Sequence, residues 1–231
     1  MSRILFVVTG ATYLELADGT RHPTGFWAEE VLTPYEAFTA AGHSVTVATP
    51  GAVVPTVDRY SLTPDANGGP ENAERIAKGL AAFAELAHPS KLEDVDLADY
   101  AAVFYPGGHG PMQDLAHDER SARLLRQTLE SGKPLGAACH GAAALLAVRD
   151  PDGGWPFAGY RLTGFSRAEE SLTGLADKVR WVLQDRLVAD GAVYEETAPW
   201  APHVVVDRNL ITGQNPGSSP QVADAMLKAL D

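Results

Sequence analysis

Pro134-Leu-Gly-Ala-Ala-Cys-His-Gly-Ala-Ala-Ala-Leu-Leu146 is the segment that decides the fold, and it holds the only cysteine among 231 residues. An apolar approach ends at Cys139-His140-Gly141, and helix-forming residues follow at once. This order predicts a strand, a sharp turn and a helix, with the thiol on a tight elbow between strand and helix. Unpaired N–H groups and the positive end of the helix dipole at such an elbow favour the thiolate.

Two interpretations of Cys139 follow from this context. A lone free cysteine is commonly a small buried core residue. His140 beside it, and small neighbours that leave room for a ligand, favour a nucleophile instead, because a catalytic thiol works with a nearby base. Those neighbours are Gly136, Ala137, Ala138, Gly141, Ala142 and Ala143.

Composition narrows the class of protein. With 45% hydrophobic residues the chain can bury one large core, so residues 1–231 are expected to form a single domain. Eighteen basic against thirty acidic residues give a net charge of −12, which makes nucleic acid and anionic membrane poor partners. One cysteine excludes an internal disulfide, and neither a signal peptide nor a transmembrane run is visible. The expected location is the cytoplasm.

The hydrophobic pattern predicts strands that alternate with helices. Strands are expected over 4–8, 44–49, 101–105, 134–138, 160–165, 192–195, 204–207 and 210–212. Helices are expected over 24–41, 71–87, 119–130 and 220–230, with a polar helix-prone region over 167–189. We interpret 15–23 as a polar loop and 53–62 as a small hairpin or irregular excursion. The alternation indicates an α/β layered domain with a mainly parallel sheet.

Ligands of such sheets bind outside the carboxyl ends of the strands. Thr9-Gly10, Gly107-Gly108 and Cys139-His140 each follow a predicted strand, so we expect these three turns on one rim. Neither a Gly-x-Gly-x-x-Gly nor a Gly-Lys-Ser/Thr loop occurs, and no His-x-x-x-His or Cys-x-x-Cys spacing suggests a metal site. The expectation is therefore a site that uses no cofactor and no metal.

The predicted first helix carries the candidate acid Glu30, on the flank of Phe26 and Trp27. Pro34 cannot donate to the carbonyl of residue 30, which predicts irregular backbone where this side chain emerges. If Glu30 is buried, its raised pKa lets it donate to a thiolate or move protons near neutral pH. A solvated glutamate is the alternative that the helix pattern by itself favours.

The remaining candidates depend on where their loops lie. An acid that orients His140 can be Glu169 or Glu170, and spacing does not decide between them. The free N–H groups of Gly107 and Gly108 can form an oxyanion hole with the elbow, or belong to an ordinary turn. His109 either lines the pocket or faces solvent. Trp200, in a proline-rich loop, either walls a small apolar pocket or packs in the core.

With these residues in hand, the sequence resembles the ThiJ/PfpI superfamily, also called class I glutamine amidotransferase-like. The resemblance is greatest to the heat-shock-chaperone-like branch with the glutathione-independent glyoxalases (glyoxalase III). The matching segments span nearly the whole chain: Pro23-Thr-Gly-Phe-Trp-Ala-Glu-Glu-Val-Leu-Thr-Pro-Tyr35, Ala48-Thr-Pro-Gly51, Phe104-Tyr-Pro-Gly-Gly-His-Gly-Pro-Met-Gln-Asp-Leu115, Ala137-Ala-Cys-His-Gly141, Leu162-Thr-Gly-Phe165 with Glu169-Glu170, and Leu210-Ile-Thr-Gly-Gln-Asn-Pro216.

The resemblance implies a flavodoxin-like three-layer sandwich with a nucleophile elbow. It implies Cys139 as nucleophile, Glu30 as the acid/base carboxyl against its sulfur, His140 beside it and Glu170 as the histidine-orienting acid. Oxyanion and substrate contacts are then expected from Gly107, Gly108, His109, Gly141 and Trp200. One departure is Ala142, where many relatives have proline.

The implied activity is a cofactor-free glyoxalase that converts methylglyoxal, a 2-oxoaldehyde, and water to lactate through a cysteine hemithioacetal. Two rivals stay open: a stress chaperone or redox-sensing protein, and a cysteine amidase or peptidase with the same Cys-His-Glu set. The family-level expectation for assembly is a homodimer.

Overall fold

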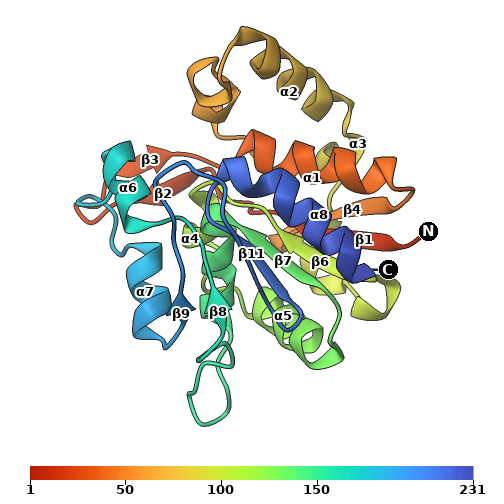
Figure 1. Ribbon diagram of the computed structural model, residues 1–231, viewed down its shortest axis with the longest axis vertical. Coiled ribbons are helices and arrows are strands. Elements are labelled where there is room, and N and C mark those ends of the chain that lie inside the picture. The colour runs from red at the N-terminus through yellow and green to blue at the C-terminus, as the bar shows by residue number, and fades with distance from the viewer. Residues whose placement is uncertain (231) are drawn as a thin grey trace.

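The computed structural model describes residues 1–230, and its centre is a seven-stranded sheet with the order β10-β11-β7-β6-β1-β4-β5 (Figure 1). All neighbouring strands are parallel except β10 and β11. The strands are β1 (Arg3–Val7), β4 (Ser44–Thr49), β5 (Ser90–Lys91), β6 (Ala102–Tyr105), β7 (Leu135–Ala138), β10 (Val204–Asp207) and β11 (Leu210–Gly213). The prediction of an α/β domain with a mainly parallel, flavodoxin-like sheet is confirmed.

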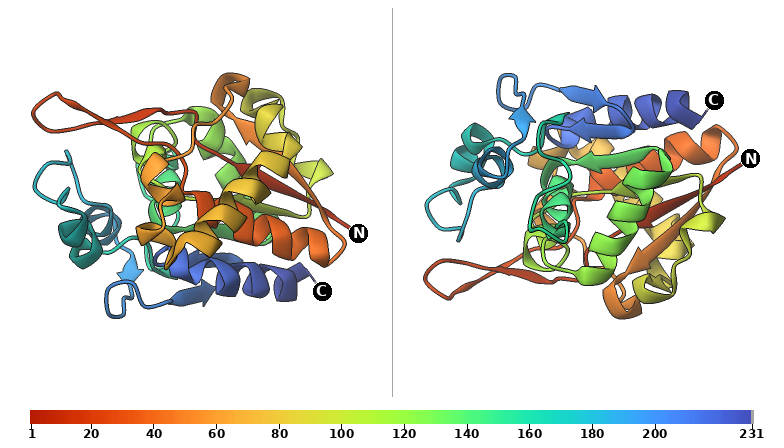
Figure 2. Two further views of the ribbon diagram at one scale, coloured as in Figure 1. Left: turned by 90° about the horizontal axis from the view of Figure 1, so that it is seen from above. Right: turned by 90° about the horizontal axis from the view of Figure 1, so that it is seen from below.

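Helices cover both faces of the sheet, as the views from above and below show (Figure 2). On one face α1 (Ala28–Ala40) and α8 (Ser219–Leu230) lie side by side over Phe6 and Phe104. On the other face α5 (Glu119–Ser131) and the 3-10 helix η6 (Cys139–Ala147) pack over Val103 and Tyr105. Apolar residues on both faces explain why the central strands are continuous hydrophobic runs.

One segment departs from the predicted pattern at a polar stretch. Residues 15–23 lie in a hairpin rather than a loop, formed by β2 (Tyr13–Glu15) and β3 (Arg21–Pro23). Its turn is Asp18-Gly19, where Gly19 has a φ of 82° and Asp18 accepts two hydrogen bonds from Thr20. Strands this short carry too few residues for an alternating pattern to show.

The remaining differences concern where elements break. The expected strand 160–165 reduces to β8 (Arg161–Leu162), which pairs with β9 (Val193–Tyr194) outside the central sheet. The helix-prone region divides into α6 (Arg167–Thr173) and α7 (Leu183–Ala189), because Gly174 ends α6 in a left-handed conformation. Residues 71–87 form α2 (Pro70–Ala82) and α3 (Ala84–Ala87), and 53–62 contains no strand.

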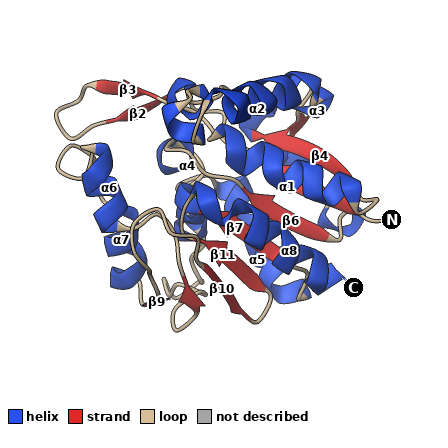
Figure 3. Cartoon of the chain, turned by 45° about the horizontal axis from the view of Figure 1, so that its top comes forward, coloured by secondary structure: helices blue, strands red, loops and turns tan. Residues whose placement is uncertain are grey.

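The sheet brings the three predicted turns to one edge. Thr9-Gly10, Pro106-Gly107 and Cys139-His140 directly follow the carboxyl ends of β1, β6 and β7, and short α4 (Gly110–Gln113) continues the second turn. The hairpin β2–β3 and helices α6 and α7 extend beyond this same end (Figure 3). Among the described helices, none is long and apolar enough to cross a membrane.

Candidate active site

Cys139 sits on the expected elbow as the first residue of η6, directly after β7. Its φ of 53° lies in the left-handed region, which is rare for a residue with a Cβ and is found at functional sites. Gly141 lets the elbow lie against β6, since an added Cβ would come within 2.2 Å of the Tyr105 carbonyl oxygen. Gly141 is therefore a packing residue, and it does not line the cavity that opens onto Cys139.

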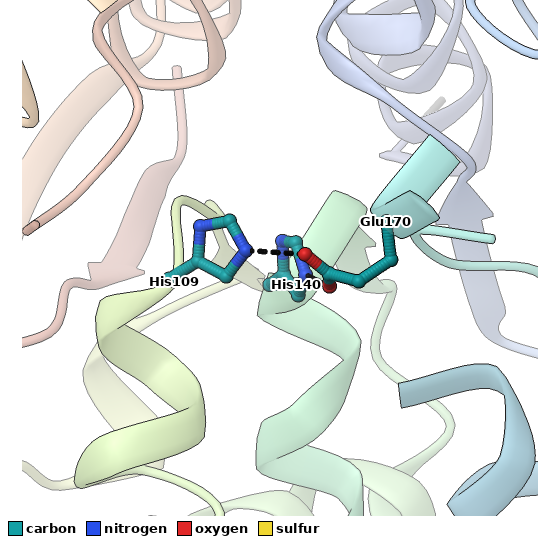
Figure 4. Close-up of side chains that lie close together, drawn as sticks. All are labelled: His109, His140 and Glu170. Carbon is teal, nitrogen blue, oxygen red and sulfur yellow. Dashed lines mark hydrogen bonds and ion pairs between the residues drawn. The ribbon is translucent and has the colours of Figure 1, made fainter. Parts of the chain in front are cut away.

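A chain of buried side chains runs from the cysteine to a carboxylate, and Figure 4 shows its histidine and glutamate members. The sulfur of Cys139 lies 3.4 Å from Nδ1 of His140, and Nε2 of His140 lies 2.7 Å from Oε2 of Glu170. The second oxygen of Glu170, Oε1, lies 2.8 Å from Nε2 of His109. The structure thus pairs His140 with Glu170 and adds a second histidine to the same carboxylate.

The protonation of these groups assigns the direction of each hydrogen bond. Burial opposes the Glu170 carboxylate, but His140 and the hydrogen bonds from both histidines outweigh it and hold its pKa below the usual range. Because an ionised carboxylate only accepts, Nε2 of each histidine carries the proton. Burial, with His109 nearby, lowers the pKa of His140 to about 4. Neutral His140 then presents an unprotonated Nδ1 to the Cys139 sulfur, where it can accept the thiol proton.

Glu30 is fully buried beside the sulfur, which rules out the solvated alternative. Its Oε2 accepts a hydrogen bond of 2.7 Å from the Gly107 N–H, and the carboxyl is near enough to Cys139 for each group to shift the pKa of the other. Its Oε1 has no hydrogen-bond partner within residues 1–230. Burial raises the pKa of Glu30 to about 8. Near neutral pH the group is a carboxylic acid, able to donate a proton toward the reacting atoms.

Helix α1 runs through Pro34 without interruption, so the predicted irregularity at this point is wrong. The proline removes one hydrogen bond to the carbonyl of Glu30, but α1 is held by packing against α8, α2 and the sheet.

The expectation that the elbow by itself favours the thiolate is also corrected. Burial raises the pKa of the Cys139 thiol, and the neighbouring Glu30 carboxylate adds to the rise, whereas the His140 N–H lowers it. Desolvation therefore outweighs the helix end in this site. Cys139 is a thiol at rest and needs the base His140 to react.

The glycine turn after β6 supplies one free amide rather than two. The Gly107 N–H is engaged by Glu30, so Gly107 is not an oxyanion donor. Within residues 1–230 no acceptor takes the Gly108 N–H, and Gly108 lines the cavity. The His140 N–H lies near the Cys139 sulfur, whose pKa it lowers. These two amides are the oxyanion donors that the geometry offers.

A cavity of about 530 Å³ opens onto Cys139, His140, Gly108 and His109. Sequence reasoning did not single out most of its wall, because these residues come from the hairpin, the loop after β4 and the segment around α6. The wall residues that it missed are His22, Trp27, Asp58, Tyr60, Phe165, Leu172, Thr173, Leu175, Lys178 and Pro216. Trp200 lines the cavity as expected.

Glu169 and Glu170, adjacent in α6, have separate partners. Glu169 accepts from the N–H and hydroxyl of Ser166 at the start of α6, at 3.0 and 2.8 Å. Its other oxygen accepts from the Trp200 N–H at 2.9 Å and from Nδ2 of Asn215 at 2.8 Å. Glu169 therefore fixes the loop of Trp200, and Glu170 is the acid of His140.

The fold also brings together a donor set that sequence spacing does not reveal. Ligand atoms of His109, His140 and Glu170 lie within 4.8 Å of one another, and two histidines with a carboxylate are a common zinc set. In the hydrogen-bonded arrangement both Nε2 atoms are protonated, so a cation can bind only after these protons leave. The mechanism below does not use a metal.

The parallel α/β sheet, the strained cysteine elbow and the paired histidine and glutamate define a class of cysteine-elbow α/β proteins. The family model described as DJ-1/PfpI matches residues 23–229. The chain therefore belongs to the DJ-1/PfpI family, which confirms the resemblance inferred from its motifs.

Individual relatives place the chain within this family. It is 29% identical to "Glyoxalase 3" of Candida albicans over 100% of this chain and 99% of that protein. It is 27% identical to "Protein/nucleic acid deglycase HchA" of Pseudomonas aeruginosa over 99% of this chain and 80% of that one. The human "Glutamine amidotransferase-like class 1 domain-containing protein 1" is 37% identical, but the match spans only 61% of this chain and 64% of the human protein.

Solved structures agree with these sequence matches. The crystal structure of glyoxalase III from Candida albicans has a TM-score of 0.85 at 26% identity, covering 100% of this chain and 98% of that one. The Francisella tularensis Rapid Encystment Protein 24 kDa has a TM-score of 0.87 at 28% identity, with both chains covered in full. The glyoxalase III structure thus shares this fold over nearly its whole length.

Proposed function

We propose that the protein is a cofactor-free glyoxalase that converts methylglyoxal and water to lactate. The observation that carries the proposal is the protonation pattern around one sulfur. A neutral imidazole nitrogen lies 3.4 Å from the Cys139 sulfur, and the buried carboxyl of Glu30, whose pKa is about 8, is a neighbour that shifts the pKa of the same thiol. An acid and a base around one nucleophile are what an internal proton transfer needs.

The first step forms the hemithioacetal. Nδ1 of His140 takes the Cys139 proton, and the sulfur adds to the aldehyde carbon. The developing oxyanion is held by the N–H groups of Gly108 and His140 and takes the proton of Glu30. Glu30 is then a carboxylate, and His140 is an imidazolium beside the Glu170 carboxylate.

The second step moves hydrogen between two carbons. Glu30 removes the proton from the former aldehyde carbon while His140 protonates the ketone oxygen, which gives an enediol. Glu30 then delivers its proton to the former ketone carbon as His140 takes the proton of the other hydroxyl. The product is a lactoyl thioester on Cys139, and the substrate has undergone an internal oxidation and reduction.

Hydrolysis completes the cycle. Glu30 takes a proton from water, the resulting hydroxide attacks the thioester carbon, and the departing sulfur recovers its proton from His140. Lactic acid leaves and ionises. Cys139, His140 and Glu30 all return to their starting protonation states.

The covalent intermediates provide the test. Intact-mass spectrometry of Glu30→Gln mixed with methylglyoxal is expected to show an adduct on Cys139 that forms and does not proceed to lactate, because the acid-base carboxyl is missing. Cys139→Ala is expected to form neither adduct nor lactate. Lactate production by Cys139→Ala at the wild-type rate would contradict the mechanism.

A second candidate is release of methylglyoxal adducts from amino groups, favoured by the similarity to the HchA deglycase over 99% of this chain and 80% of that protein. The same cysteine would attack the carbon that bears the amine. Incubation with a preformed adduct of N-acetyllysine distinguishes the two, since a deglycase releases free lysine side chains faster than the adduct dissociates unaided. Hydrolysis of glutamine or model peptides would instead support the amidase interpretation.

A further inference from the structure

Exposed apolar side chains gather around the cavity that leads to Cys139. Tyr60, Leu172 and Trp200 line it, and they are 59%, 63% and 48% exposed. Large apolar side chains at this level of exposure gain little from packing within the chain. Their common position at one cavity indicates that they serve a ligand.

The backbone around Trp200 supports this interpretation. Trp200 has a φ of 66°, a conformation that a bulky residue adopts only when its surroundings enforce it. Two fully buried polar side chains do so, because Glu169 accepts the Trp200 N–H and Asn215 donates to the next residue's carbonyl at 2.8 Å. A strained backbone held by buried groups presents the indole at the mouth of the cavity.

Aromatic rings continue from the mouth to the reacting atoms. The Phe165 ring centroid lies 5.7 Å from the Trp200 ring and 4.4 Å from the His140 ring. A second pair, Trp27 and Tyr60, has a separation of 6.2 Å. An aromatic ligand beside Phe165 and Trp200 would find edge and face contacts at the distances that aromatic pairs prefer.

The size and charge of the cavity fit the same ligand. At about 530 Å³ it is in the range of sites that enclose drug-sized molecules, and the methyl group of methylglyoxal would leave most of it empty. Its charged wall residues, Asp58 and Lys178, have opposite signs. The wall therefore offers apolar contact rather than recognition of one charge.

We propose that the preferred substrate is a 2-oxoaldehyde whose substituent is an aromatic ring, with the aldehyde at Cys139 and the ring packed beside Phe165 and Trp200. This inference rests on the proposed glyoxalase function and names its substrate class. The chemistry is unchanged: phenylglyoxal and water give mandelate, as methylglyoxal and water give lactate, without a further reactant.

The test compares kcat/KM for phenylglyoxal and methylglyoxal in the wild type, Leu172→Ala and Trp200→Gly. Glycine is chosen at position 200 because it accepts the left-handed backbone while removing the ring. The wild type is expected to have a kcat/KM for phenylglyoxal at least about tenfold above that for methylglyoxal. Each variant is expected to reduce this ratio, by up to about tenfold. Val188→Ala, at a 50% exposed valine of α7 that does not line the cavity, should leave the ratio unchanged.

The outcomes separate this inference from the function on which it rests. Turnover of methylglyoxal with a ratio near one overturns the aromatic preference and leaves the glyoxalase intact. Absence of turnover with either compound overturns the proposed function. In that case calorimetry with mandelate and lactate still tests the cavity: equal affinities overturn the preference, and tighter mandelate binding that Trp200→Gly abolishes supports it.

Discussion

Adjacent residues in this site have unlike roles because their side chains leave α6 toward different partners. Glu170 holds two histidines, and Glu169 holds Ser166, Trp200 and Asn215. Both carboxyl groups are buried, so neither is available for a role at the surface. Substitutions of the two residues can therefore be compared directly: Glu170 orients the base His140, and Glu169 holds the Trp200 loop that lines the cavity.

Glu170→Gln is expected to lower kcat at least about a hundredfold, because an amide cannot accept from both histidine Nε2–H groups. One imidazole must then change tautomer or lose its bond. Glu169→Gln is expected to keep kcat for methylglyoxal within about threefold and to raise KM for phenylglyoxal, since it loosens the Trp200 loop. Steady-state kinetics of both variants measure the difference. Equal losses of kcat would contradict the division of roles.

At the scale of elements, the active site depends on how closely the turn after β6 approaches helix α1 and the elbow after β7. The Gly107 turn after β6 touches both Glu30 of α1 and the elbow after β7. A Cβ at residue 107 would lie 2.7 Å from Glu30 Oε2 and 2.8 Å from both the Ala138 oxygen and the His140 nitrogen. The turn accepts no side chain without displacing the reacting groups.

Gly107→Ala is therefore expected to destabilise the fold by about 1–3 kcal/mol and to reduce activity more than tenfold. Gly10→Ala is the control, because the nearest atom to a Cβ at residue 10 would be the Cβ of Val53, at an ordinary contact distance of 3.5 Å. That control should change stability by no more than about 0.5 kcal/mol. Urea unfolding and lactate assays of both variants check this, and a fully active Gly107→Ala would show that the contact is not limiting.

The elements also show which parts of the structure the sequence could predict. Long apolar runs identify β1 and β6 because burial on both faces leaves a continuous signal, and the buried Val45, Val47 and Ala48 identify β4. The hairpin β2–β3 and the short pair β8–β9 lack that signal, since two or three residues do not establish a period.

The site was predictable to the extent that its residues are local in sequence. Cys139 and His140 are neighbours at a strand end, so the elbow follows from pattern. Glu30 and Glu170 were assigned only through the family resemblance. The contact of His109 with Glu170 joins residues 61 positions apart. The hydrophobic pattern of the sequence does not predict such a contact, because the contact depends on how the α6 segment folds back over the sheet.

For the whole molecule, buried ionisable groups make stability depend on pH. The folded-state pKa of Glu30 is about 8, above its ordinary value of 4.5. Between these values the folded protein binds more protons than the unfolded chain, so this group makes the free energy of unfolding fall as pH rises. His140 acts at lower pH: its folded pKa of about 4 lies below 6.5, so stability falls as pH drops through that window.

Glu30→Gln isolates the first effect because glutamine does not titrate. Its stability relative to the wild type is expected to increase with pH by up to about 1.4 kcal/mol per unit between pH 5 and 8. Urea unfolding at several pH values gives the difference. A constant difference across this range would mean that Glu30 is not buried as an acid.

The homodimer suggested by the resemblance stays a separate prediction, open to sedimentation analysis.

The most direct measurement is the fate of methylglyoxal with the purified wild-type protein, in the presence of a chelator and without glutathione. The proposed chemistry at Cys139 predicts that substrate loss is matched by formation of lactate of a single configuration, and that Cys139→Ala forms none. Disappearance of methylglyoxal without lactate, or equal lactate from both proteins, would contradict it.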